Sequence, residues 1–158
     1  MTDGHEKTGF EPVLERARLD DLGAVVAIDA TSQRWTHEAF ASELGHEPPT
    51  VYVLRLSGAV AGFAVIRMVG ADLDIVNVAV EEAQRRQGLG RSLLRQLFAH
   101  AGSRGVGSVF LEVRESNQAA RALYESLGFD ETQRRRNFYA NPVEDAVLMS
   151  LKIAGSQG

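Results

Sequence analysis

Three consecutive runs rich in β-branched and aromatic residues restrict the folds open to this chain more than any other feature. They read TVYVLRLSG, AVAGFAVIRMVG and ADLDIVNVAV, and together they fill residues 50–80. The dipeptides Ser57-Gly58 and Gly70-Ala71 separate the runs and are typical of short turns. The pattern therefore predicts an antiparallel meander of three strands.

The periodicity changes immediately after the meander. Apolar residues then recur at the spacing of one helix face, at Leu89, Leu93, Leu94, Leu97, Phe98 and Ala101. Three glycines within six residues, at 102, 105 and 107, indicate where this helix ends.

The same rules assign the rest of the chain. We expect strands at 13–19, 108–115, 129–139 and 143–153, a helix from Asp20 to about residue 30, a helix over 36–44, and a helix capped by Asn117 and closed by Gly128. The order is β-α-α-β-β-β-α-β-α-β-β, which predicts an α+β fold with helices covering a mixed sheet.

Composition limits the class of protein. A chain of 158 residues with 44% hydrophobic and 24% charged residues is expected to form a single domain, 1–158, with a core over about 10–154 and mobile tails at 1–9 and 155–158. The net charge of −4 argues against general nucleic-acid binding. The polar start and the lack of a long apolar run predict a cytoplasmic protein with no membrane partner.

The stretch QRRQGLGR (84–91) places glycines between arginines at the start of the amphipathic helix. It is not a P-loop, because the chain has no Gly-Lys pair. It lacks the third glycine of a dinucleotide fingerprint, although Glu112 lies about where that motif needs a ribose-binding acid. Free N–H groups at a helix N-terminus bind anions, so the loop predicts a phosphate site; a solvated basic turn is the alternative.

Several motifs resemble the GNAT family (GCN5-related N-acetyltransferases). NVAVEEAQRRQGLGRSLLRQL, FLEVRESNQAARALYESLGF, RRNFY and EDAVLM stand in the order and spacing of its RimI-type branch, which acetylates protein N-termini. The resemblance covers residues 13–153 and implies the GNAT fold. This fold has a central, mostly antiparallel mixed sheet of about seven strands with a splay, flanked by about four helices.

The resemblance also implies acetyl-CoA as co-substrate. In the family R-x-x-G-x-G/A cradles the pyrophosphate, the splayed strand bonds the pantetheine arm, and one N–H of that strand polarises the thioester carbonyl. Asn117 contacts CoA in relatives and also has the chemistry of a helix cap. The cofactor-binding residues implied are Val78, Ala79, Val80, Arg85, Arg86, Gln87, Gly88, Leu89, Gly90, Arg91 and Asn117.

Glu112 is the implied general base, since it stands at the family's position for this role. In FLEV, Phe110 and Glu112 share one strand face, so we expect a partly desolvated carboxylate whose pKa is raised. The residues alone favour a structural role over a general base, with Glu112 in an ion pair with Arg114 or Arg67.

Tyr124 is the implied proton donor to the departing thiolate. Its place in the apolar stripe with Leu123 and Leu127 also fits a packed core tyrosine. The two catalytic assignments, Glu112 and Tyr124, therefore rest on the resemblance.

Acceptor binding is assigned to Trp35 on one wall, with a core anchor as the alternative, and to Arg136 and Tyr139 on the other. Relatives carry Tyr where this chain has Phe138, and the segment before Val143 is shortened. These two departures affect the expected peptide specificity.

The absence of certain residues and motifs from the sequence limits the possible catalytic mechanisms. There is no cysteine, no G-x-S-x-G and no metal-ligand spacing, which favours direct transfer in a ternary complex without a metal. We expect an N-terminal acetyltransferase with the N-terminal alanine of small-subunit ribosomal protein eighteen as acceptor and no direct contact with nucleic acid. The alternatives are an enzyme for broader N-terminal peptides or small amines, and a non-catalytic acetyl-CoA sensor.

Overall fold

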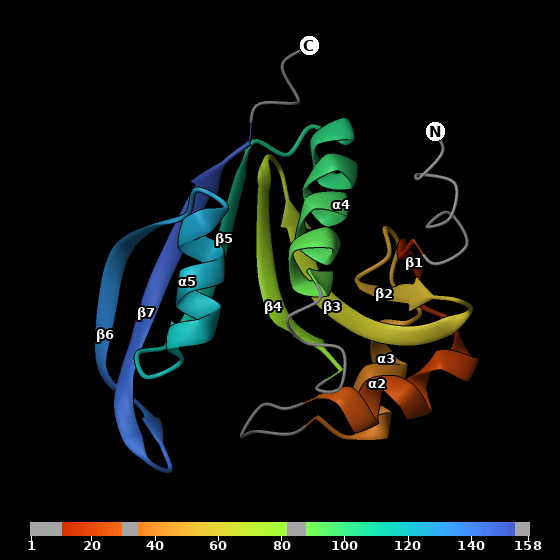
Figure 1. Cartoon of the computed structure of the whole chain (residues 1–158), viewed down its shortest axis with the longest axis horizontal. Coiled ribbons are helices and arrows are strands. Elements are labelled where there is room, and N and C mark those ends of the chain that lie inside the picture. The colour runs from red at the N-terminus through yellow and green to blue at the C-terminus, as the bar shows by residue number, and fades with distance from the viewer. Residues whose placement is uncertain (1–10, 30–34, 82–87, 154–158) are drawn as a thin grey trace, which may run out of the picture. The chain divides into compact units, whose positions relative to one another are not determined.

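The computed structural model describes residues 11–29, 35–81 and 88–153 of the chain. Its strands form a seven-stranded sheet in the order β1-β2-β3-β4-β5-β7-β6, accompanied by the helices α2 to α5 (Figure 1). The expected α+β fold and the expected order of elements are confirmed. The two tails predicted at 1–9 and 155–158 lie outside the described residues.

The boundaries follow the sequence signals closely. The elements are β1 (Val13–Arg16), a 3-10 turn (Leu19–Asp21), α2 (Leu22–Ile28), α3 (His37–Glu43), β2 (Val51–Leu56), β3 (Ala59–Val69), β4 (Asp72–Val80), α4 (Leu89–Ser103), β5 (Ser108–Arg114), α5 (Gln118–Ser126), β6 (Asp130–Ala140) and β7 (Val143–Lys152).

The first strand is shorter than predicted. It ends at Arg16 rather than at residue 19, because the backbone N–H of Arg18 donates to Asp21 Oδ2 at 2.8 Å and the chain turns there. That carboxylate also accepts from Arg55 at 2.9 and 3.0 Å. Burial acts to raise the pKa of Asp21, but the hydrogen bonds from Arg55 and Arg18 outweigh it and the pKa is lowered.

The chain divides into two compact units. The first comprises residues 1–65 and 77–97, and its core is built on fully buried Phe40 and Phe63. The ring of Phe40 lies 5.0 Å from that of Trp35 and 5.5 Å from that of Phe63. The antiparallel pairing of β1 with β2 and of β2 with β3 confirms these parts of the meander.

The second unit comprises residues 66–76 and 98–158, and α5 crosses one face of its strands β5 and β7 (Figure 1). Val109, Leu111 and Val113 alternate as buried residues along β5. On β7 their register partners include buried Val147 and Met149. These side chains form the apolar face against which the unit packs.

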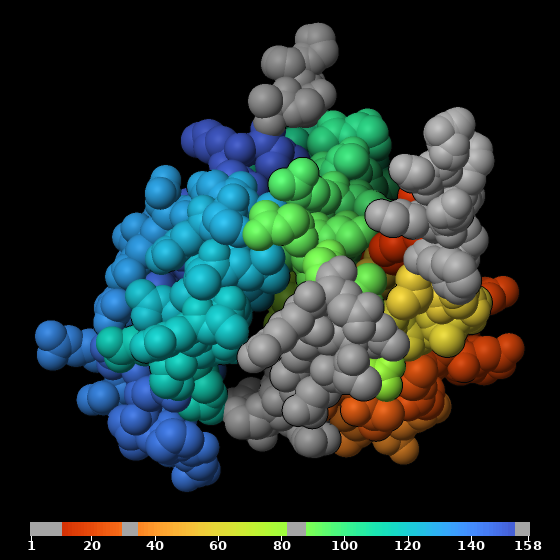
Figure 2. Space-filling view, in the orientation of Figure 1, coloured from red at the N-terminus to blue at the C-terminus, as the bar shows by residue number. Residues whose placement is uncertain are grey.

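The outer strand of the second unit has a different character. Every residue of β6 is exposed except Tyr139, and side chains of this segment project from the molecular surface in Figure 2. Arg134 joins Glu131 at 2.9 Å and Glu115 at 2.8 Å, and lies 4.0 Å from Asp145. Charged side chains joined in ion pairs, rather than buried apolar side chains, therefore line this end of the sheet.

The predicted splay appears as an unusually short ladder between β4 and β5. Parallel pairing runs only from Asp72 with Ser108 to Ile75 with Leu111, although β4 continues to Val80 and β5 to Arg114. In the described part of the chain, no helix is both long and apolar enough to cross a membrane.

Gly62 of β3 should not tolerate a side chain. A Cβ there would lie 3.0 Å from the backbone oxygen of Ala79, 3.0 Å from Val80 Cγ1 and 3.2 Å from Leu93 Cδ1. We expect Gly62→Ala to lower the free energy of unfolding by about 1–3 kcal/mol, the usual cost of overpacking. Chemical denaturation measures this effect.

Gly23→Ala in α2 is the matched control, because a Cβ there has nothing within 4 Å. It should stabilise by up to about 1 kcal/mol through helix propensity. Equal stabilities for the two variants would contradict the close approach of β3 to β4.

Candidate functional site

The N-terminus of α4 has the geometry of an anion site. Gly88 has a left-handed backbone with φ of 78°, and Leu89, only 5% exposed, anchors the first turn. Ser92 N–H donates to the Gly88 oxygen at 3.0 Å, so the N–H groups before Ser92 precede the helical ladder. These groups and the positive end of the helix dipole favour an anionic ligand. Arg85, Arg86 and Gln87 lie outside the described residues.

The end of β4 presents backbone groups on the edge that faces away from β3. Glu81 N–H donates to the Ala61 oxygen at 2.8 Å, and strand groups alternate in direction from one residue to the next. The backbone of Ala79 therefore faces β3, whereas the N–H and C=O groups of Val78 and Val80 face the other edge. Of the three predicted strand ligands, Val78 and Val80 have the required orientation.

Glu112 lies on the exposed face of β5. Its side chain is 36% exposed, which is more than the desolvated carboxylate expected from the sequence. Glu112 Oε2 lies 4.0 Å from Nε of Arg135 on β6, an arginine that was not among the expected partners. The carboxylate is open to a ligand from this face.

Tyr124 is buried in α5, with 8% of its surface exposed. Its ring centroid lies 5.6 Å from that of Phe129, so the expectation of a packed tyrosine is met. Burial raises the pKa of Tyr124 to about 12, which keeps the phenol protonated throughout the neutral range.

Sequence reasoning did not predict that Glu112 and Tyr124 belong to opposite faces of the sheet in the second unit. A Cβ on Gly128, just after α5, would lie 3.0 Å from Leu151 Cδ1, and Leu151 pairs with Val109. The helix therefore covers the face of Val109 and Leu111, while Glu112 points the other way. A base and an acid on opposite faces can serve one reaction only where the sheet is open.

The predicted cap is present. Asn117 Oδ1 accepts from Ala120 N–H at 3.1 Å, and the Asn117 residue itself is exposed. Its contact with CoA stays a prediction.

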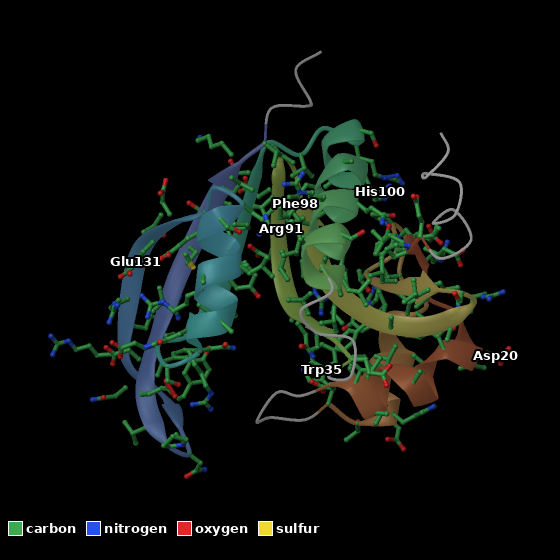
Figure 3. The ribbon with its side chains drawn as sticks, viewed as in Figure 1. Asp20, Trp35, Arg91, Phe98, His100 and Glu131 are labelled. Carbon is green, nitrogen blue, oxygen red and sulfur yellow. The ribbon has the colours of Figure 1, made fainter. Side chains whose placement is uncertain are left out.

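The residues assigned to the acceptor fall in both units. Trp35 is partly exposed and packs on the core of the first unit beside α3 (Figure 3). In the second unit Arg136 is exposed on β6, and the guanidinium carbon of Arg114 lies 4.2 Å from the ring centre of Tyr139. The structure thus anchors Trp35 and Tyr139 by ring contacts within their own units.

A buried polar pair in the first unit was not predicted. Asp29 is 1% exposed and accepts from Trp35 N–H at 2.9 Å and from Asn77 Nδ2 at 3.4 Å. Asn77 is 6% exposed, and its Oδ1 has no partner in the described structure. The signal was an amide in DIVNVAV at a position in phase with buried Leu73 and Ile75.

The described residues contain no group of three His, Cys, Asp or Glu side chains that could hold a metal ion.

Known proteins resemble this chain in sequence and in fold. A model of the acetyltransferase (GNAT) family matches residues 19–129. A ribosomal protein bS18-alanine N-acetyltransferase of Escherichia coli strain K12 is 44% identical over 138 residues, which cover 85% of this chain and 93% of that protein.

Solved structures agree with the sequence match. The crystal structure of the alanine N-acetyltransferase for the same ribosomal protein from Escherichia coli has a TM-score of 0.82 at 39% identity, over 90% of this chain and 94% of that chain. Ard1 from Thermoplasma volcanium also has a TM-score of 0.82, at 25% identity, over 90% of this chain and 97% of that chain.

The Asp29–Asn77 pair gives a test of buried charge. Asn77→Asp would place a second carboxylate against Asp29, and we expect it to lower the free energy of unfolding by about 3 kcal/mol. Combining it with Asp29→Asn should restore most of that loss, because the new amide can donate to the new carboxylate and still accept from Trp35 N–H. Denaturation of both variants measures the difference.

Asp29→Asn alone is the control. The Asn77 amide can turn so that its Oδ1 accepts from the introduced NH₂, and the cost should then stay below about 1.5 kcal/mol. A double variant no more stable than Asn77→Asp would contradict direct pairing of the two side chains.

Proposed function

The chain belongs to the acetyltransferase (GNAT) family, and we propose that it is an acetyl-CoA-dependent Nα-acetyltransferase whose acceptor is the N-terminal alanine of small-subunit ribosomal protein eighteen. The observation that carries the proposal is the likeness to the Escherichia coli enzyme along nearly its whole length. The geometry of the described residues supports each half of the reaction separately.

Two features favour acetyl-CoA as the donor. The first turn of α4, opened by left-handed Gly88, suits the pyrophosphate, because its N–H groups and dipole complement a negative charge. The edge of β4 that carries the N–H and C=O groups of Val78 and Val80 suits the amides of the pantetheine arm. We assign Val80 N–H to the thioester carbonyl, where it would stabilise the developing oxyanion.

Glu112 supplies the base. An N-terminal amine has a pKa of about 7.7–8.0, so it must lose a proton before it can attack the thioester carbon. In our proposal Glu112 first takes a proton from the ammonium, directly or through a water. The neutral amine then forms the C–N bond, the C–S bond breaks, and the second nitrogen proton passes to solvent. The exposure of Glu112 on a face without α5 supports approach of the acceptor from that side.

Tyr124 serves the departing sulfur. Its pKa of about 12 means that the phenol carries a proton to donate. A thiol has a pKa of about 8.5, so complete transfer from the phenol is uphill and the phenol acts chiefly as a hydrogen-bond donor while the C–S bond breaks. The thiolate released in this way takes its proton from solvent, and Tyr124 keeps its own.

Acetylation of an N-terminal peptide library with acetyl-CoA, read by mass spectrometry, tests the proposed acceptor. Peptides beginning with the N-terminal alanine sequence of the ribosomal protein should be modified fastest. Comparable rates on unrelated N-termini would instead favour a broader acetyltransferase. Acetyl-CoA binding without modification of any peptide would favour a sensor.

Glu112→Gln removes the base but keeps size and hydrogen-bonding shape. Turnover at neutral pH should fall by about 10²–10⁴-fold while acetyl-CoA affinity stays close to wild type. Activity should partly return as the pH rises past about 8, because the amine then arrives neutral. Rate profiles from about pH 6 to about pH 9.5 measure this, and parallel profiles for variant and wild type would remove Glu112 from the mechanism.

Tyr124→Phe keeps the ring against Phe129 and removes only the hydroxyl. Because the ring contact is kept, the melting temperature should change little. Turnover should fall by about 10²-fold, the lower end for a positioned acid, since full proton transfer is uphill. Near wild-type turnover would return Tyr124 to a purely structural role.

A further inference from the structure

An irregularity in β6 lies among the residues that surround Glu112. Arg135 pairs with Ala146 and Tyr139 pairs with Glu144, so β6 advances four positions while β7 advances two. The two extra residues form a bulge over positions 136–138. At its centre Asn137 has a left-handed backbone with φ of 50°, and its N–H donates to Asp145 Oδ1 at 2.9 Å.

The bulge preserves which face each side chain occupies. Residues directly opposite in a ladder share a face, and an even number of extra residues returns the strand to the same phase. Arg114 pairs with Ala146 on one side of β7, and Ala146 pairs with Arg135 on the other. Arg114, Arg135 and Tyr139 therefore lie on the Glu112 face, opposite α5.

The contacts on this face are close. Arg135 lies 4.0 Å from Glu112, and Arg114 stacks on Tyr139 at 4.2 Å. Arg114 also bonds Glu144 at 3.1 Å, and Glu144 accepts from Ser116 N–H at 2.9 Å. Burial and then the charge of Glu112 raise the pKa of Tyr139, which is consistent with this proximity.

We propose that Asn137 and Asp145 are positioning residues that hold the bulge so that Arg135 and Tyr139 flank Glu112 on the path of the acceptor peptide. This inference rests on the proposed function, since it takes Glu112 as the base. A peptide whose N-terminus reaches Glu112 must cross the face that carries Tyr139 and Arg135. Left-handed backbone is costly for most residues other than glycine, but asparagine adopts it readily, so Asn137 suits the centre of the bulge.

The test compares substitutions at Asn137. Asn137→Val disfavours the left-handed backbone because valine is β-branched, whereas Asn137→Gly permits it. We expect Asn137→Val to raise the KM for the alanine-terminated peptide by about tenfold or more, with a smaller change in kcat and with acetyl-CoA affinity kept. Asn137→Gly should keep the KM within about threefold of wild type.

A matched control lies at the turn between β2 and β3. Ser57 is the other described non-glycine residue with positive φ, at 55°, and it belongs to the first unit. Ser57→Val should lower the melting temperature through the same backbone strain without changing the KM for the peptide. A rise in KM for Ser57→Val equal to that for Asn137→Val would overturn the positioning role.

Substitutions at Asp145 test its side-chain acceptor. Asp145→Asn keeps an oxygen for Asn137 N–H, and Asp145→Ala removes it. The alanine variant should resemble Asn137→Val, and the asparagine variant should resemble wild type. Equal effects of the two would show that the charge of Asp145, rather than its hydrogen bond, matters, and would overturn the proposal.

Crystal structures of wild type and Asn137→Val separate this inference from the proposed function. In the variant we expect the bulge to change register and Tyr139 to leave Arg114. An unchanged Tyr139 would refute the positioning role whatever the activity. A wild-type protein that acetylates no peptide, with the variant bulge shifted as expected, would refute the proposed function and leave the role of Asn137 and Asp145 in shaping this face intact.

Discussion

The parallel pairing of β4 with β5 stops after four residue pairs, and the chemistry assigned to this chain depends on that early end. A continuous ladder would satisfy the N–H and C=O groups of Val78 and Val80 with strand partners and leave none for a ligand. It would also close the sheet between the face of Glu112 and the face of α5. In the proposed mechanism Glu112 and Tyr124, which belong to opposite faces, act on one thioester, and this requires the ladder to end where it does, at Ile75 and Leu111.

Most of the fold was predictable because its signals are local. The turns at Ser57-Gly58 and Gly70-Ala71, the helical stripe that begins at Leu89 and the Asn117 cap are each decided within a few residues. The errors of the prediction are equally local: β1 ends early because the Asp21 carboxylate accepts a hydrogen bond from the backbone N–H of Arg18. The early end of the β4–β5 ladder was predicted instead from the resemblance to a family, because no local sequence pattern indicates where two strands separate.

The details of the candidate site could not be predicted, because they depend on register between distant strands. The neighbour of Glu112 is Arg135, and that pairing is fixed by β7, which lies between their strands. The bulge at Asn137 could not be predicted, because it lies in a run of polar residues that has no alternation of apolar and polar side chains to reveal an extra residue. The orientation of Ala79 toward β3 also follows only from the hydrogen bond of its neighbour Glu81.

The exposed character of β6 has a consequence for how the protein behaves in a crowded solution. β6 is the last strand in the sheet order, and a terminal strand invites edge-to-edge pairing between molecules. Arg134 with its acidic neighbours and the bulge at Asn137 both make such pairing unfavourable. Substitutions that removed charge from this strand, or flattened it, would therefore promote self-association, so colloidal solubility limits which sequences β6 can carry.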